Sequence, residues 1–88
     1  MGNPLLKKKN TWIVTGGAGF IGSNLIGHLI KNNQNVICID NLSTGYIKNL
    51  TFYKSKKFIF IKKDIRKVKL KDIKRKIDYV VHLAALGS

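Results

Sequence analysis

The amino-acid sequence predicts an α/β fold with a parallel β-sheet. Short apolar runs rich in β-branched residues recur along the chain, and amphipathic or polar segments separate them. The run 36–40 is apolar on both faces, as a central strand of a parallel sheet must be. Glycines join the first apolar run, 11–15, to a helical pattern. Strands that alternate with helices favour right-handed crossovers and therefore parallel pairing.

The first half of the chain is expected to form a strand, a helix and a second strand. Residues 1–10 are a basic, loosely ordered lead, and the first strand covers 11–15. A helix is predicted over 20–31 and ends in the Asn-rich run 32–35. The apolar residues predicted to share its buried face are Ile21, Leu25, Ile26, Leu29 and Ile30. His28 lies off this face, and we expect it to be solvated.

The second half continues the alternation. A third strand is predicted over 58–62, a short basic helix over 66–76 and a fourth strand over 78–83. The residues of this half expected to pack toward the sheet from the helical region are Val68, Ile73 and Ile77. The expected strand order is 3-2-1-4, the N-terminal half of a Rossmann doubly wound sheet, truncated after the fourth strand. Residues 11–88 are therefore interpreted as part of one Rossmann domain.

Composition excludes several classes of protein. One cysteine excludes an internal disulfide framework, and Cys38 is expected to be a small buried apolar residue. No apolar run approaches the roughly 18 residues of a membrane span. The first residues lack the apolar core of a secretory signal, and Leu6 breaks the myristoylation pattern. We therefore expect a cytoplasmic protein without a membrane partner.

The net charge of +13 would, by itself, favour binding to nucleic acid or to another anionic surface. The lysines are scattered along the chain, and the clusters at 54–57 and 74–76 flank predicted strands, where solvated charge is normal. We expect no nucleic-acid partner, and a basic nucleic-acid-binding protein stays the less favoured alternative. Attraction to anionic dinucleotides and nucleotide sugars fits the same charge.

Three glycines spaced three apart follow the first predicted strand. Gly16 allows a tight turn, Gly19 lets a pyrophosphate approach backbone N–H groups, and Gly22 allows close packing of helix and strand. The pyrophosphate would then lie at the helix N-terminus, where the dipole is positive. An ordinary glycine-rich loop is the alternative, but the strand before and the helix after favour a dinucleotide-binding turn.

An acidic residue ends the second predicted strand. Asp40 lies 24 residues after Gly16, close to the roughly 20 expected for the carboxylate that accepts hydrogen bonds from the adenosine ribose. A carboxylate at this position favours NAD over NADP, because it repels a 2′-phosphate. The alternative is that Asp40 is a turn residue that terminates the strand.

Four segments resemble the extended short-chain dehydrogenase/reductase family, which contains the NAD-dependent nucleotide-sugar epimerases and dehydratases. These segments are 15–23, 40–45, 64–65 and 81–85. The ending 84–88 and the Asp-Asn-x-Ser-Thr-Gly loop most resemble UDP-N-acetylglucosamine 4-epimerases, with UDP-glucose 4-epimerases close behind. Such enzymes act in polysaccharide biosynthesis.

The resemblance implies a role for each matching position. The pyrophosphate turn comprises Gly16, Gly19, Phe20, Ile21 and Gly22. The adenosine ribose is expected near Asp40, Asn41, Leu42, Ser43, Thr44 and Gly45. The adenine is expected at Asp64 and Ile65, and the nicotinamide-side ribose at Leu83, Ala84 and Ala85. The loop that faces the sugar nucleotide is expected to begin at Gly87 and Ser88.

The resemblance assigns no catalytic residue to this chain. The family's chemistry removes a hydride from the sugar C4 and returns it to the other face, with a Tyr base and a Lys four residues later. In the family those residues lie beyond position 88. Tyr53 and Lys57 spell Tyr-x-x-x-Lys, but they precede the third strand, so we interpret the match as coincidence. His82 falls in a motif whose role in the family is structural.

The leading hypothesis is the N-terminal NAD-binding part of a UDP-sugar 4-epimerase, cut short by a truncated or frameshifted reading frame and inactive alone. The alternative is a non-catalytic dinucleotide-binding module or remnant. The full-length family member is expected to be a homodimer. In this chain the fourth strand, near 79–83, would leave an apolar sheet edge unpaired, so we expect self-association or aggregation.

Overall fold

The computed structural model describes residues 8–16, 19–41, 55–69, 71, 73 and 75–83. Its elements, in chain order, are β1 (Thr11–Thr15), α1 (Phe20–Lys31), β2 (Asn35–Asp40), β3 (Phe58–Lys62), the 3-10 helix η3 (Ile65–Lys67) and β4 (Tyr79–His82). The bounds of β1, α1 and β3 are those predicted from the sequence. The strand β2 begins one residue earlier, and β4 is one residue shorter at each end.

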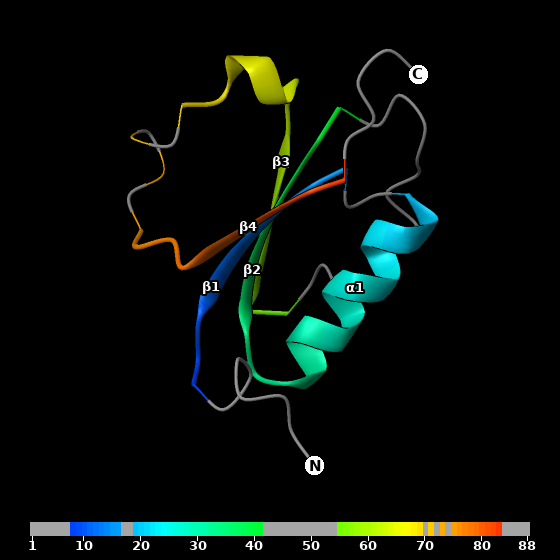
Figure 1. The fold of residues 1–88 in the computed structure, drawn as a ribbon, viewed down its shortest axis with the longest axis vertical. Helices are drawn as coiled ribbons and strands as arrows, with labels where there is room; N and C mark the ends of the chain where they lie inside the picture. The colour runs from blue at the N-terminus through cyan, green and yellow to red at the C-terminus, as the bar shows by residue number, and fades with distance from the viewer. Residues whose placement is uncertain are drawn as a thin grey trace.

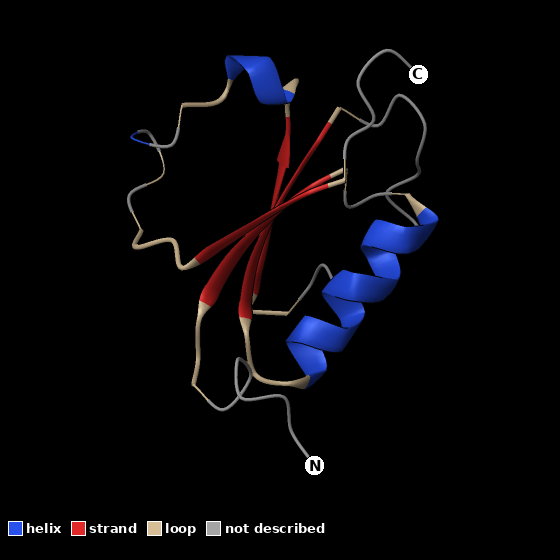
Figure 2. Cartoon of the chain, viewed as in Figure 1, coloured by secondary structure: helices blue, strands red, loops and turns tan. Residues whose placement is uncertain are grey.

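The four strands form one parallel sheet in the order β3-β2-β1-β4, which confirms the predicted order. Helix α1 lies along one face of this sheet (Figure 1). The described residues between β3 and β4 lie on the other side of the sheet (Figure 2). The strand β4 is held to β1 by backbone pairing and by the ring of Tyr79, whose centroid lies 4.5 Å from that of Trp12.

The main hydrophobic core lies between the sheet and α1. Helix α1 contributes Ile26 and Leu29, and both side chains are almost fully buried. The strands contribute Trp12, Val14, Val36, Cys38 and Phe58. Cys38 is buried with a free thiol, so the expectation of a small buried apolar residue is confirmed.

The prediction that Ile21 belongs to the buried face of α1 was wrong, because its side chain is 72% exposed. The buried residues of the helix are Gly22, Ser23, Ile26 and Leu29. Successive helical residues are rotated by about 100°, so Ile21 points well away from the stripe through Gly22, Ile26 and Leu29. Leu25 and Ile30 flank this stripe and are partly buried against the core. The side of the helix that carries the small residues Gly22 and Ser23 therefore faces the sheet.

The second face of the sheet is covered without the short helix predicted over 66–76. The side chains packed there on Ile13, Ile37 and Ile39 include Val68, Ile73 and Ile77, as expected. The 3-10 helix η3 ends at Lys67, and the described residues 68 and 69 after it are not helical. Arg75 N–H donates to the carbonyl of Ile73 (2.8 Å), a bond that an α-helix does not make. Three β-branched residues need burial but disfavour a helix, and a short isolated helix is marginal.

A buried glutamine closes the amino-terminal end of the sheet. Gln34 Oε1 accepts hydrogen bonds from Trp12 Nε1 (2.8 Å) and from the backbone N–H of Asn10 (3.1 Å). Its Nε2 donates to the carbonyls of Lys8 (2.8 Å) and Asn32 (3.1 Å). These bonds satisfy the buried amide and fix the last residues of the basic lead against the domain.

Candidate functional site

The turn after β1 requires glycine at its first position. Gly16 has a φ of 74°, in the left-handed region where a side chain would be strained. Its N–H donates to the carbonyl of Ile39 at 2.9 Å. This bond ties the turn at the end of β1 to the end of β2, directly before Asp40.

No side chain of the described residues caps the N-terminus of helix α1. Gly19 is the N-cap residue, and its carbonyl accepts the N–H of Ser23 at 2.9 Å. The first turn carries no acidic residue. The first N–H groups of a helix have no partner within it, and they carry the positive end of the dipole. This end of α1 can therefore accept an anion.

The protein alone does not demand glycine at position 19. Gly19 has φ −76° and ψ 174°, which any residue can adopt. A methyl group built there would lie 3.6 Å from the carbonyl oxygen of Gly16, the nearest described atom and an ordinary contact. Any strict need for glycine at this position would therefore come from a ligand that approaches the backbone.

Asp40 lies at the carboxyl end of β2, beside the glycine turn. Its Cα is in register with that of Lys62, and its carbonyl accepts the N–H of Lys63 at 3.1 Å. The side chain is half-buried. Figure 1 shows the ends of β1 and β2 at the same end of the molecule as the start of α1. Ligands of open α/β sheets bind at this edge.

Asp64 follows β3 at the same edge, but Arg66 occupies its carboxylate. Arg66 donates from its backbone N–H (2.9 Å) and Nε (3.1 Å) to Oδ1, and from Nη2 to Oδ2. These bonds lower the pKa of Asp64 to about 2, so it stays ionised near neutral pH. Reasoning from sequence missed this pairing. An adenine amine would have to share the carboxylate with Arg66.

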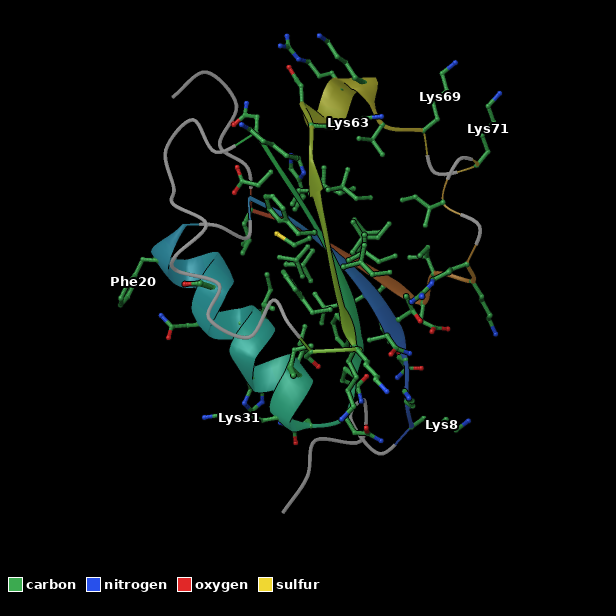
Figure 3. All side chains as sticks on the ribbon, turned by 180° about the vertical axis from the view of Figure 1, so that it is seen from behind. Lys8, Phe20, Lys31, Lys63, Lys69 and Lys71 are labelled. Carbon is green, nitrogen blue, oxygen red and sulfur yellow. The ribbon has the colours of Figure 1, made fainter. Side chains whose placement is uncertain are left out.

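Two large apolar side chains are exposed where α1 begins. Phe20 is 82% exposed and Ile21 is 72% exposed. Figure 3 shows Phe20 directed away from the domain. Neither side chain belongs to a core cluster of the described residues. Both therefore stay available to contact a ligand or another part of a larger protein.

The end of β4 is joined to the end of β1 through a threonine. The hydroxyl of Thr15 and Nδ1 of His82 share a hydrogen bond of 2.7 Å. The N–H of Leu83 donates to both the carbonyl (2.9 Å) and the hydroxyl (3.2 Å) of Thr15. This arrangement supports a structural role for His82 and places Leu83 at the carboxyl edge of the sheet.

Several predicted site residues lie outside the described part of the chain, so their roles stay predictions. They are Leu42, Ser43, Thr44, Gly45, Ala84, Ala85, Gly87 and Ser88, and Tyr53 of the coincidental motif lies there too. Asn41 is described and exposed. Among the described residues, no cluster of three or more His, Cys, Asp or Glu could hold a metal ion. None of the described helices has the length and apolarity to cross a membrane.

Comparison with known proteins identifies the family. A model described as the NAD dependent epimerase/dehydratase family matches residues 12–88. The chain belongs to this family. It is 41% identical over 76 residues to a UDP-glucose 4-epimerase of Mycolicibacterium smegmatis, an alignment that covers 83% of this chain and 24% of the relative.

Solved structures of epimerases and dehydratases share the fold. A UDP-N-acetylglucosamine 4-epimerase from Methanobrevibacter ruminantium, in complex with UDP-N-acetylmuramic acid, matches with 43% identity and a TM-score of 0.82, over 92% of this chain and 26% of that one. A dTDP-glucose 4,6-dehydratase from Bacillus anthracis, in complex with NAD, matches with 29% identity and a TM-score of 0.77, over 86% and 27%. The epimerase-family chain thus spans about a quarter of these relatives and has a Rossmann-like fold.

Proposed function

We propose that residues 11–88 are the NAD-binding part of a nucleotide-sugar 4-epimerase. The observation that carries the proposal is the hydrogen bond from Gly16 to Ile39, because it sets the glycine turn against Asp40. Two features 24 residues apart in sequence thereby meet at one edge of the sheet. Family membership and the NAD complex of a related dehydratase support NAD as the cofactor.

Each described residue of this edge has a distinct binding task in the proposal. The N–H groups at the start of α1 hold the pyrophosphate, and Gly19 leaves room for its approach. Asp40 accepts hydrogen bonds from the adenosine ribose, and Asp64 accepts one from the adenine amine. Leu83 begins the segment that passes the nicotinamide-side ribose. When bound, NAD supplies the hydride chemistry, and these residues orient it.

The remaining roles extend the proposal to the complete enzyme. Ala84 and Ala85 continue past the nicotinamide, and Gly87 and Ser88 begin the loop facing a UDP-sugar, either UDP-N-acetylglucosamine or UDP-glucose. The enzyme would take hydride from the sugar C4 and return it to the other face, as a cytoplasmic homodimer. The names of the 43% and 41% identical epimerases support this choice.

The 88-residue chain alone is proposed to bind NAD without turnover. Its sheet edge at β4 exposes 54% of Val80, which supports the proposal that the isolated chain self-associates or aggregates. Size-exclusion chromatography with light scattering tests this, and a monodisperse monomer would contradict it.

Calorimetric titration of the chain with NAD tests the proposed function. We expect saturable binding and no interconversion of UDP-sugars in the same samples. Lack of binding at millimolar NAD would overturn the proposal. If the chain binds duplex DNA as tightly as it binds NAD, and if its affinity falls steeply as salt is added, the nucleic-acid alternative would be favoured instead. Sequencing past codon 88 separates an enzyme part from a non-catalytic module, since the former predicts a downstream Tyr-x-x-x-Lys.

A further inference from the structure

A lysine lies beside the carboxylate proposed to hold the ribose. Lys62 is the last residue of β3, and its Cα is in register with that of Asp40 in the parallel pair. Residues in register on neighbouring parallel strands project to the same face. Phe58 pairs with Val36 in the same register, and both belong to the core under α1. Lys62 and Asp40 therefore share the face of the sheet that α1 covers.

The side chain of Lys62 can reach the surroundings of Asp40. Neighbouring strands are about 4.8 Å apart, and the Lys stem spans about 6 Å. Lys62 is exposed and makes no ion pair with any described residue. Lys63 follows it, is also exposed, and donates its N–H to the Asp40 carbonyl. A cation is thus available at the carboxyl edge next to the ribose carboxylate.

Apart from Asp40 itself, the described acidic residues are Asp64 and Asp78. Arg66 and Asp64 neutralise each other. Asp78 lies at the opposite end of the sheet, where it accepts the N–H of Thr11 at 2.8 Å. The chain as a whole carries a net charge of +13, which attracts phosphate.

We propose that Lys62 determines cofactor specificity by admitting a dinucleotide with a phosphate on the 2′-oxygen of the adenosine ribose, in addition to NAD. The inference rests on the proposed function, because it requires the ribose to lie at Asp40. The carboxylate of Asp40 repels the 2′-phosphate of such a dinucleotide. The ammonium of Lys62 offsets that repulsion, so NAD is preferred by a narrower margin than it would be without Lys62.

The expected change in the affinity for NADP relative to NAD follows from the charges involved. A 2′-phosphate carries nearly two negative charges, and Lys62→Glu changes the local charge by two. At a separation of about 6 Å in a solvated site, this weakens NADP binding relative to NAD on the order of tenfold. The neutral Lys62→Gln variant should give about half that effect on a logarithmic scale, or roughly threefold.

The test is the ratio of the dissociation constants for NADP and NAD, measured by calorimetry on the full 88-residue chain and its variants. Lys31→Glu is the matched control, since it makes the same charge change at the exposed end of α1, opposite Lys63 in Figure 3. We expect the ratio to rise in Lys62→Glu and less in Lys62→Gln, and to stay unchanged in Lys31→Glu. Circular dichroism checks that each variant is folded.

The outcomes separate the two proposals. NAD binding with a ratio that Lys62→Glu and Lys62→Gln both leave unchanged would overturn the inference and leave the proposed function standing. NAD binding without any detectable NADP binding in the wild-type chain would do the same. Failure to bind either dinucleotide would overturn the proposed function, and the inference with it.

Discussion

Replacement of Gly19 by alanine separates the needs of the fold from those of the ligand. In the protein alone the new methyl group meets the Gly16 carbonyl oxygen at 3.6 Å, an ordinary van der Waals distance. The backbone of Gly19, at φ −76° and ψ 174°, suits alanine. The matched variant is Gly16→Ala, where φ is 74° and a side chain is strained.

The two variants should shift stability in opposite directions. Alanine restricts the unfolded chain more than glycine does, so Gly19→Ala should raise the free energy of unfolding by about 0.4–1 kcal/mol. Gly16→Ala should lower it by roughly 1–2 kcal/mol, because its left-handed conformation is unfavourable for alanine.

Dinucleotide binding should respond differently. Loss of one charge-assisted hydrogen bond between backbone and pyrophosphate costs about 1.5–3 kcal/mol, so Gly19→Ala should weaken NAD binding by roughly ten- to a hundredfold. Urea unfolding monitored by tryptophan fluorescence gives the stabilities, and calorimetry gives the affinities. A Gly19→Ala chain that binds NAD like the wild type would refute the placement of the pyrophosphate. A destabilised Gly19→Ala chain would refute the geometry of the turn.

Three further predictions concern the fold and the edge that carries the site. Ile26→Ala should lower the free energy of unfolding by about 2–5 kcal/mol, because it empties the core under α1, and urea unfolding measures this. Thr15→Val should cost about 0.5–1.5 kcal/mol in the same assay by removing the hydroxyl that meets His82, and an unchanged midpoint would count against that link. Arg66→Ala should raise the pKa of Asp64 from about 2 toward its ordinary value of 3.8, as followed by carboxyl NMR titration. Because folding lowers the pKa of Asp64, its pair with Arg66 contributes fully to stability above about pH 4, and this contribution is lost as the pH falls from about 4 to 2. In Arg66→Ala this part of the pH dependence of stability should be absent.

Much of the fold is readable from local sequence. Helix α1 begins directly after Gly19, its N-cap residue, and ends at an Asn-rich run. Asn33, in that run, has a φ of 63°, which asparagine tolerates better than most residues. The strand order followed from alternation and handedness, which are general constraints on parallel sheets.

Some features of the fold that sequence reasoning missed depend on contacts between distant segments. Gln34 could not be recognised as a buried clamp, because its partners Asn10 and Trp12 lie more than twenty residues away. Burial of Val68 was predicted but the conformation of its segment was not, since the same apolar residues can be buried by a helix or by an irregular chain.

The candidate site was also predicted only in part. Gly16 and Asp40 were found from spacing, because the glycine turn and the acid have fixed offsets in a βαβ unit. The pairing of Asp64 with Arg66 was not predicted, although the two residues are close in sequence. A single Asp-x-Arg spacing fits many surface arrangements and singles out none of them.

NMR mapping tests whether the carboxyl edge of the sheet holds NAD. In a titration of the ¹⁵N-labelled chain with NAD, we predict saturable shifts at the backbone amides of Gly16, Gly19 and Asp40. The amide of Gln34, at the opposite end of the sheet, should not shift. Saturable shifts at Gln34 without shifts at the glycine turn, or no shifts at all, would contradict NAD binding at this edge.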